Sequence, residues 1–262
     1  MVVTLNLSHT LSVVVRGDKL KTMNTHFSHL QAAIIDLDGT MVDTLGDFEV
    51  ALNRTLADLD LPPIQRDLVS RTVGKGSEHL IRSVLTHQLA LPEVQSSGLM
   101  CASRTLDDLY ELAWPRYQHH YLGINGEFAQ VYPCVAEGLQ QLRSAGLVLA
   151  CLTNKPLSFA KPLLAAKGLD RYFSHVFGGD SFARKKPDPL PLLRTCEILG
   201  TEPARTLMVG DSSNDALAAR AAGCPVVLVR YGYNHGQPVD AVDADAHVDV
   251  LTQIQGALTL AC

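Results

Sequence analysis

Carboxylates, a hydroxyl and an ammonium recur in this chain just after short apolar runs. The residues are Asp36, Asp38, Thr153, Lys186 and Asp211. Three carboxylates gathered at one place repel one another and need a cation, and hard oxygen ligands select Mg²⁺ or Ca²⁺. A divalent ion with a lysine close by makes a site for a dianionic phosphoryl group. The residue types therefore predict phosphoryl chemistry around a divalent metal ion.

The elements that must position these residues alternate between two kinds. Near-continuous apolar runs over 33–35, 148–152, 176–177, 207–209 and 226–229 predict strands buried on both faces of a parallel sheet. Helical patterns over 135–145, 158–167, 190–200 and 214–222 lie between most of them, and each is followed by a glycine. The alternation predicts an α/β fold with a doubly wound, mostly parallel sheet. Ligands bind beyond the carboxyl ends of such strands, where the residues above should converge.

One connection in this pattern is much too long. About 110 residues separate the first strand, which ends near Asp36, from the second, which starts near Leu147. A crossover between parallel strands needs only a dozen or more residues. The excess shows only helical patterns, over 48–59, 77–90 and 103–121. We therefore expect an all-helical cap over 46–131, inserted into a catalytic core formed by 23–45 and 132–262.

Each motif also has a purely structural interpretation. Asp38-Gly39 is an ordinary turn signal, and Lys185-Lys186 could be a solvated surface pair. Thr153-Asn154 and the segment Gly210-Asp211-Ser212-Ser213 could cap the helices that follow them. Their joint occurrence, in order and at successive strand ends, favours the functional interpretation.

Four motifs together resemble the haloacid dehalogenase superfamily over nearly the whole chain from about residue 31. They are Asp36-x-Asp38-Gly39-Thr40-x-x-Asp43, Thr153-Asn154, Lys186-Pro187 and Gly210-Asp211-x-x-Asn214-Asp215. The departures are Met41 for the usual leucine and Thr44 for the usual serine. Four further segments resemble the phosphoglycolate phosphatase subgroup: Val73-Gly74-Lys75-Gly76, Thr153-Asn154-Lys155-Pro156, Lys185-Lys186-Pro187-x-Pro189 and Tyr231-Gly232-Tyr233-Asn234-x-Gly236.

The resemblance implies a Rossmann-type core and a Mg²⁺-dependent phosphatase that acts on a small phosphate monoester. The expected reaction converts 2-phosphoglycolate to glycolate and phosphate through an aspartyl-phosphate intermediate. Asp36 would be the nucleophile, and Asp38 would serve as general acid and then as general base. The Mg²⁺ ligands implied are the carboxylates of Asp36 and Asp211 and the backbone carbonyl of Asp38.

The resemblance also implies how the substrate is held. Phosphoryl oxygens would meet the Thr153 hydroxyl, the Asn154 backbone N–H and Lys186, which Asp215 would orient. Gly39 and Thr40 of the first motif join this substrate-binding set.

Cap residues are the expected source of substrate specificity. Lys75, between Gly74 and Gly76, is the candidate for the substrate carboxylate, although a flexible turn with an exposed lysine would have the same sequence. His79 and Arg82 are further cationic candidates in the cap. Tyr231 and Asn234 are expected to shape the rim of the site.

Two kinds of alternative stay open. The first is another capped enzyme of the superfamily: a sugar phosphatase, a phosphoglucomutase-like enzyme, or a phosphonatase-like enzyme that would use Lys75 to form a Schiff base. The second is a non-catalytic protein that binds a phosphorylated ligand. Such a protein usually lacks the nucleophile, the acid or the lysine, and this chain has all three.

Composition excludes several other classes. The net charge of −5 disfavours binding to nucleic acid or to anionic membranes. The chain has neither a Gly-x4-Gly-Lys-Ser/Thr nor a Gly-x-Gly-x-x-Gly motif for nucleotides, and its six scattered cysteines form no CxxC pair. It also has no run of 18 apolar residues. We expect a cytoplasmic monomer or small homo-oligomer, with residues 1–22 as an N-terminal extension whose charge order does not match a signal peptide.

Overall fold

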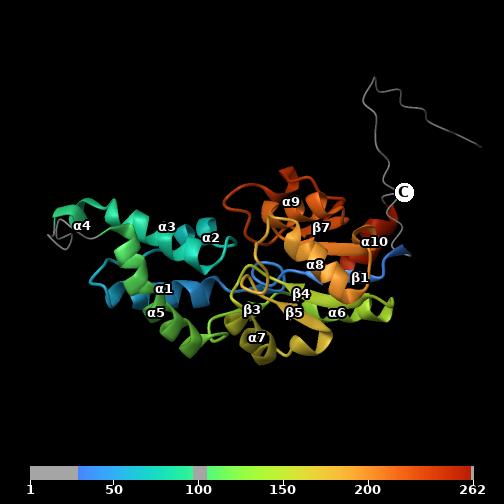
Figure 1. Ribbon diagram of the computed structural model, residues 1–262, viewed down its shortest axis with the longest axis horizontal. Helices are drawn as coiled ribbons and strands as arrows, with labels where there is room; N and C mark the ends of the chain where they lie inside the picture. The colour runs from blue at the N-terminus through green and yellow to red at the C-terminus, as the bar shows by residue number, and fades with distance from the viewer. Residues whose placement is uncertain (1–28, 97–104, 261–262) are drawn as a thin grey trace, which may run out of the picture.

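A six-stranded parallel sheet forms the centre of the larger part of the molecule (Figure 1). The structure, a computed structural model, describes residues 29–96 and 105–260, so the extension expected over 1–22 lies outside the described residues. The strands lie in the spatial order β5 (His175–Phe177), β4 (Val148–Leu152), β1 (Ala32–Ile35), β6 (Thr206–Gly210), β7 (Val226–Val229) and β8 (Ala246–Val248). All five neighbouring pairs are parallel, which confirms the predicted α/β fold class.

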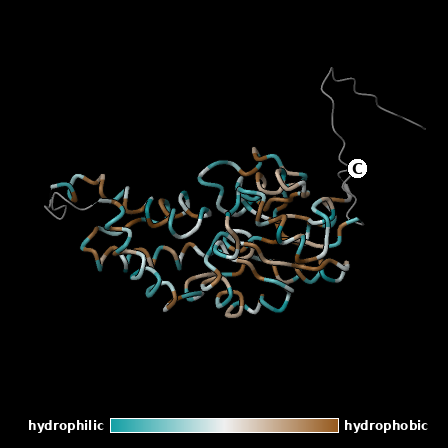
Figure 2. The backbone as a smooth tube through the Cα atoms, in the orientation of Figure 1, coloured by the Kyte–Doolittle hydropathy of each residue, from teal (hydrophilic) through white to brown (hydrophobic). Residues whose placement is uncertain are grey.

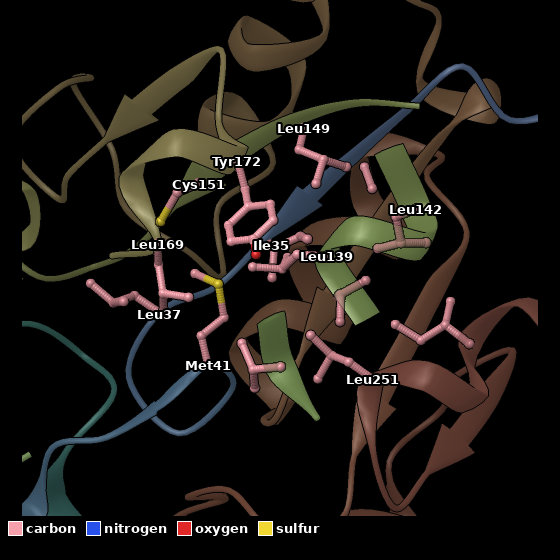
Figure 3. Packing of buried hydrophobic residues seen from close by; sticks show 14 of the residues in the cluster. Ile35, Leu37, Met41, Leu139, Leu142, Leu149, Cys151, Leu169, Tyr172 and Leu251 are labelled. Carbon is pink, nitrogen blue, oxygen red and sulfur yellow. The ribbon is translucent and has the colours of Figure 1, made fainter. Parts of the chain in front are cut away.

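Helices cover both faces of this sheet because successive side chains of a strand point to opposite sides. In β1, Ala33 and Ile35 pack with α6 (Val135–Ser144), α7 (Leu157–Ala166) and α10 (Ile254–Leu260). Ile34, between them, packs with α8 (Leu190–Leu199) and α9 (Ser213–Ala222) on the other face. Figure 3 shows the first of these layers, in which Ile35 and Leu149 from the sheet meet Leu139 and Leu142. The sheet is therefore doubly wound, as predicted.

A second group of helices lies between β1 and β4 in the chain and forms the cap, on the left of Figure 1. The helices are α1 (Leu45–Ala57), α2 (Arg66–Thr72), α3 (Ser77–Leu89), α4 (Pro92–Ser96) and α5 (Leu106–Ile124). Helices α1, α2, α3 and α5 pack around a hydrophobic cluster that includes Phe48, Leu52 and Tyr117. In Figure 2 the cap helices carry both hydrophobic and hydrophilic stretches, as helices with one buried face do.

A short antiparallel ribbon joins the cap to the core. Strand β2 (Val42–Asp43) pairs with β3 (Gln130–Val131), so that the chain enters and leaves the cap side by side. Beside the ribbon, buried Asp47 accepts hydrogen bonds from the backbone N–H of Gly126 at 2.7 Å and of Phe128 at 2.8 Å. Lys167 Nζ in turn donates to the Gly126 and Ala129 carbonyls, both at 2.7 Å. The segment by which the chain leaves the cap is thus hydrogen-bonded both to Asp47 of α1 in the cap and to Lys167 of the core.

The predicted elements of the core lie within one or two residues of those observed, and Gly146, Gly168, Gly200 and Gly223 all have a positive φ. The cap helix expected over 103–121 runs from Leu106 to Ile124, residues 103 and 104 being outside the described ones. The sequence patterns missed six short elements: α2, α4, α10, β2, β3 and β8. Elements of two to seven residues are too short to show a period. Among the described residues, no helix combines the length and apolar character that a membrane-spanning segment needs.

Candidate active site

A cavity lies where the carboxyl ends of β1, β4 and β6 meet the cap. Seven of the ten predicted site residues line it: Asp36, Asp38, Thr153, Asn154, Lys186, Asp211 and Asp215. The cap contributes Phe48, Gly74, Gly76 and Ser77 to its wall. The structure therefore brings the four sequence motifs together at one edge of the sheet, under the cap.

Lys186 is the centre of a buried charge cluster. Its Nζ lies 2.9 Å from Asp36 Oδ1 and 2.7 Å from Asp215 Oδ1, and it donates to the Leu152 carbonyl at 2.8 Å. Burial alone would lower the pKa of Lys186, but the charges of Asp215 and Asp36 outweigh burial and raise it. Lys186 is therefore held as a cation between two carboxylates.

Asp215 has a second role, at the start of α9. Its Oδ2 accepts hydrogen bonds from the Ser212 backbone N–H at 3.2 Å and from the Ser212 hydroxyl at 2.9 Å. The helix-capping interpretation of the segment 210–213 is thus correct: Ser212 is the N-cap of α9 and forms a capping box with Asp215, which also holds Lys186.

Asp211 is fixed from two sides. Its Oδ1 accepts a hydrogen bond from the Thr40 hydroxyl at 3.1 Å, and its Oδ2 accepts one from the Tyr233 backbone N–H at 2.6 Å. Gly39 and Thr40 lie outside the cavity lining and act on this carboxylate from behind: a Cβ on Gly39 would lie 2.1 Å from Asp211 Oδ2. Tyr231 donates to the Thr40 carbonyl at 2.8 Å.

Tyr233 lines the cavity, although the sequence analysis selected its neighbours Tyr231 and Asn234 for the rim. Its hydroxyl donates to Asp43 Oδ1 and accepts from the Thr44 backbone N–H at 3.0 Å. Asn234 instead accepts from the Ser213 backbone N–H at 3.0 Å.

The donor set fits a hard divalent cation. Carboxylate oxygens of Asp36, Asp211 and Asp215 lie within 4.8 Å of one another, all three residues being buried. Burial raises the pKa of Asp36, and burial together with the charges of Asp215 and Asp36 raises that of Asp211. Within the described part of the chain, no group donates a well-oriented hydrogen bond to Asp36 Oδ1, although Lys186 Nζ lies beside it. A cation among these oxygens would relieve their repulsion, and oxygen ligands of this kind suit Mg²⁺.

Asp38 is held apart from the other carboxylates. Its Oδ1 accepts hydrogen bonds from the Thr44 hydroxyl at 2.8 Å and from Lys155 Nζ at 2.9 Å, and its Oδ2 lies 3.2 Å from the same Nζ. Its side chain is not part of the cluster of Asp36, Asp211 and Asp215, and the contact of its backbone carbonyl with a metal ion stays a prediction. Lys155 was not among the residues predicted for the site, although its place directly after Thr153-Asn154 at a strand end was a signal.

Asn154 joins three parts of the site through its side chain. Its Oδ1 accepts from the Lys186 backbone N–H at 3.0 Å, and its Nδ2 donates to the Lys186 carbonyl at 2.8 Å and to the Gly74 carbonyl of the cap at 3.0 Å. Thr153 Oγ1 accepts from the Lys155 backbone N–H at 3.2 Å, a local turn contact that ends before α7 begins. The capping interpretation of Thr153-Asn154 is therefore wrong: the N-cap of α7 is Pro156, whose side chain makes no capping hydrogen bond. The side-chain contacts of Asn154 were not predicted from the sequence, and the contact of its backbone N–H with a phosphoryl oxygen stays a prediction.

The cationic cap candidates lie away from the cavity wall. Lys75 is exposed and borders an adjoining, more open depression with Arg184 and Lys185, whereas its neighbours Gly74 and Gly76 line the cavity. The two hollows share Lys186 and Asn214 as lining residues. Arg82 pairs with Glu78 at 3.0 Å and with Asp107 at 2.6 Å. His79 is exposed. The role of Lys75 toward a substrate carboxylate stays a prediction.

Comparison with known proteins places this geometry in a family. The family model of haloacid dehalogenase-like hydrolases matches residues 30–223. The chain is 40% identical over 225 residues to a phosphoglycolate phosphatase of Thiobacillus denitrificans. The aligned region covers 86% of this chain and 93% of that relative. It is 43% identical over 229 residues to a plasmid-encoded phosphoglycolate phosphatase of Cupriavidus necator, with 87% and 93% covered.

A solved structure agrees with these sequence matches. The crystal structure of a predicted phosphoglycolate phosphatase from Haemophilus somnus superposes with a TM-score of 0.79 at 32% identity, covering 87% of this chain and 97% of that one. The superfamily and the hydrolase class expected from the four motifs are thereby confirmed. With its motifs gathered in one cavity beneath a helical cap, the chain belongs to the haloacid dehalogenase-like hydrolase family.

Proposed function

We propose that this protein is a Mg²⁺-dependent phosphatase that hydrolyses 2-phosphoglycolate to glycolate and inorganic phosphate. The observation that carries the proposal is the placement of two buried carboxylates with different surroundings in one cavity: Asp36 beside Lys186, and Asp38 beside Lys155. One suits a nucleophile and the other an acid–base group. The names of the relatives from Thiobacillus denitrificans and Cupriavidus necator support the choice of substrate.

In the first step a carboxylate oxygen of Asp36 attacks phosphorus, and the bond from phosphorus to the ester oxygen breaks. Asp38, protonated, gives its proton to that oxygen, so that glycolate leaves as an alcohol. An acyl phosphate remains on Asp36. The hydrogen bond from the Thr44 hydroxyl holds Asp38 in place for this transfer.

In the second step Asp38, now a carboxylate, takes a proton from water, whose oxygen attacks the phosphorus of the acyl phosphate. The bond between phosphorus and Asp36 breaks, inorganic phosphate leaves, and both carboxyl groups return to their starting states. Lys186 offsets negative charge on Asp36 and on the phosphoryl group in both steps.

Mg²⁺, held by the carboxylates of Asp36 and Asp211 and by the Asp38 carbonyl, would supply positive charge to the phosphoryl oxygens. The Thr153 hydroxyl and the Asn154 backbone N–H meet the remaining phosphoryl oxygens. The cap closes the cavity with Phe48, Val73 and Leu80, which exclude bulk water from the acyl phosphate.

A panel of small phosphate monoesters, ranked by kcat/KM with Mg²⁺ present, tests the proposal. We expect 2-phosphoglycolate to rank first by at least about tenfold over alkyl phosphates that carry no carboxylate, the effect of one charge-assisted contact. Release of inorganic phosphate should need no sugar bisphosphate. A sugar phosphate at the top of the ranking would favour the sugar phosphatase alternative. A requirement for a bisphosphate activator would favour the phosphoglucomutase-like alternative, and absence of turnover on every ester would favour the non-catalytic one.

A further inference from the structure

Two lysines line the cavity, and only one has a place in the proposed mechanism. Lys186 lies between Asp36 and Asp215 and also donates to a backbone carbonyl. Lys155 comes from the loop after β4, and its side chain is 1% exposed. A buried ammonium is costly unless it is paired, so its presence asks for an explanation.

The surroundings of Lys155 leave part of its donor capacity available. Its Nζ lies 2.9 Å from Asp38 Oδ1 and 3.2 Å from Asp38 Oδ2, and it stands 4.3 Å from the centre of the Phe48 ring and 4.7 Å from that of Tyr121. An ammonium has three N–H donors, of which the two Asp38 oxygens take two. Among the described residues, the third N–H has no hydrogen-bond acceptor assigned to it, and Lys155 borders the cavity. The aromatic rings hold the cation through their faces without consuming a donor.

The position of Lys155 matches the shape of the proposed substrate. The ester oxygen of 2-phosphoglycolate must lie at Asp38 to receive its proton, and a single methylene group separates this oxygen from the carboxylate. A cation in contact with Asp38 is therefore within reach of that carboxylate. Lys75, by contrast, is exposed and lies outside the cavity wall.

Charge balance leads to the same residue. Four carboxylates line the cavity, from Asp36, Asp38, Asp211 and Asp215, against the two ammonium groups. The metal ion would sit among Asp36 and Asp211, at the phosphoryl end of the substrate. At the Asp38 end, Lys155 is the cation that lines the cavity wall among the residues the structure describes.

We propose that Lys155 determines specificity by binding the substrate carboxylate with its third N–H while it stays in contact with Asp38. The proposal rests on the proposed function and adds to it the group that recognises the acid. It predicts that the enzyme selects esters whose carboxylate is one carbon away from the ester oxygen. The rings of Phe48 and Tyr121, from cap helices α1 and α5, tie this recognition to the closed cap.

The test compares two esters of nearly the same size, 2-phosphoglycolate and ethyl phosphate, of which only the first carries a carboxylate. The variants are Lys155→Met and Lys155→Gln, with Lys161→Met as a matched control on the exposed side of α7 and Lys75→Met as the competing candidate. The ratio of kcat/KM for the two esters is independent of the fraction of folded enzyme. We expect both Lys155 variants to lower this ratio about 10- to 150-fold, the value of one charge-assisted contact, and Lys161→Met to leave it unchanged.

Binding of unreactive analogues repeats the comparison without turnover. Calorimetry with 3-phosphonopropionate and propylphosphonate, in which a methylene group replaces the ester oxygen, should show the same loss of preference in the Lys155 variants in the presence of Mg²⁺. Equal losses on both ligands in both experiments would mean that Lys155 only positions Asp38, and would overturn the inference while the proposed function stands. So would a loss of preference in Lys75→Met alone. A wild-type enzyme without preference for 2-phosphoglycolate over ethyl phosphate would overturn the proposed function, and this inference with it.

Discussion

Lys186 Nζ lies 2.9 Å from Asp36 Oδ1, and both side chains are almost completely buried. The lysine comes from the loop before α8, 150 positions along the chain from the aspartate at the end of β1. In a medium of low polarity each charge needs the other, because removing one partner leaves an uncompensated charge. The Lys186–Asp36 ion pair is therefore needed both for the stability of the core and for the proposed phosphoryl transfer.

Lys186→Met should therefore destabilise the protein and abolish turnover together. Two buried carboxylates, Asp36 and Asp215, would lose their shared cation, which costs about 3–5 kcal/mol in the free energy of unfolding. Urea unfolding without Mg²⁺ measures this, with exposed Lys161→Met as the control. A loss below about 1 kcal/mol would show that the pair has the energy of a solvated surface bridge.

Asp36→Asn should abolish turnover and leave the fold intact. An amide is a poor nucleophile and a weaker ligand for a metal ion, yet it has nearly the shape of the carboxylate. The assay is phosphate release from 2-phosphoglycolate, with circular dichroism as the control for folding. Residual activity above roughly 1% of wild type would contradict a covalent role, because loss of a nucleophile costs several powers of ten.

Chelation by EDTA should remove activity, and Mg²⁺ should restore it. Binding should also stabilise the folded state, by about 2.7 kcal/mol at a Mg²⁺ concentration of 100 times Kd. Thermal unfolding with and without Mg²⁺ measures this apart from activity. Asp211→Asn should remove most of the Mg²⁺-dependent shift in Tm; a shift as large as that of wild type would exclude Asp211 as a ligand.

Gly39 and Gly146 provide a matched pair for the packing behind Asp211. Both have left-handed backbone conformations, with φ of 85° and 89°, but a Cβ on Gly39 would meet Asp211 Oδ2 at 2.1 Å, whereas one on Gly146 would meet nothing within 4 Å. Gly146→Ala should cost about 1–2 kcal/mol from backbone conformation alone and keep its activity. Gly39→Ala should cost about 1–3 kcal/mol more and lose activity, because Asp211 must move. Similar activity in the two variants, by the phosphate-release assay, would refute this packing role.

The Gly74 carbonyl of the cap accepts hydrogen bonds from two core side chains, Asn154 at 3.0 Å and Asn214 at 3.3 Å. Asn214→Ala should weaken cap closure by about 0.5–1.5 kcal/mol and lower kcat/KM roughly 2- to 10-fold. Amide hydrogen exchange of residues 73–76 should become faster in the variant. Unchanged exchange together with unchanged kcat/KM would show that Asn214 does not hold the cap.

The core of this fold could be predicted because its signals are local. Runs such as 148–152 and 226–229 are apolar throughout, since strands buried on both faces leave no position for a polar residue. Three of the four motifs directly follow such a strand, so the rule that ligands bind at strand carboxyl ends was enough to bring Asp36, Thr153 and Asp211 together.

The parts that could not be predicted depend on contacts between distant residues. The importance of Lys155 depends on the fold, which places its ammonium at Asp38, 117 positions away, and over the faces of the Phe48 and Tyr121 rings. Lys75 was predicted to bind the substrate carboxylate because glycines flank it. The direction of a side chain in a loop, however, is set by tertiary packing rather than by local sequence. Tyr233 lines the cavity and Tyr231 does not, because the chain turns between them. The sequence pattern carries no signal for that turn.

The ribbon of β2 and β3 places Val42 opposite Val131, so the two points at which the cap is spliced into the core are neighbours. An insertion with adjacent ends adds little loop-closure entropy to the host, because the gap that the host must bridge is the same with or without it. A short hairpin turn between Asp43 and Gln130 would bridge that gap as well. Caps of other shapes could therefore be joined to the core at these two strands, while the motif residues at the carboxyl ends of β1, β4 and β6 keep their places.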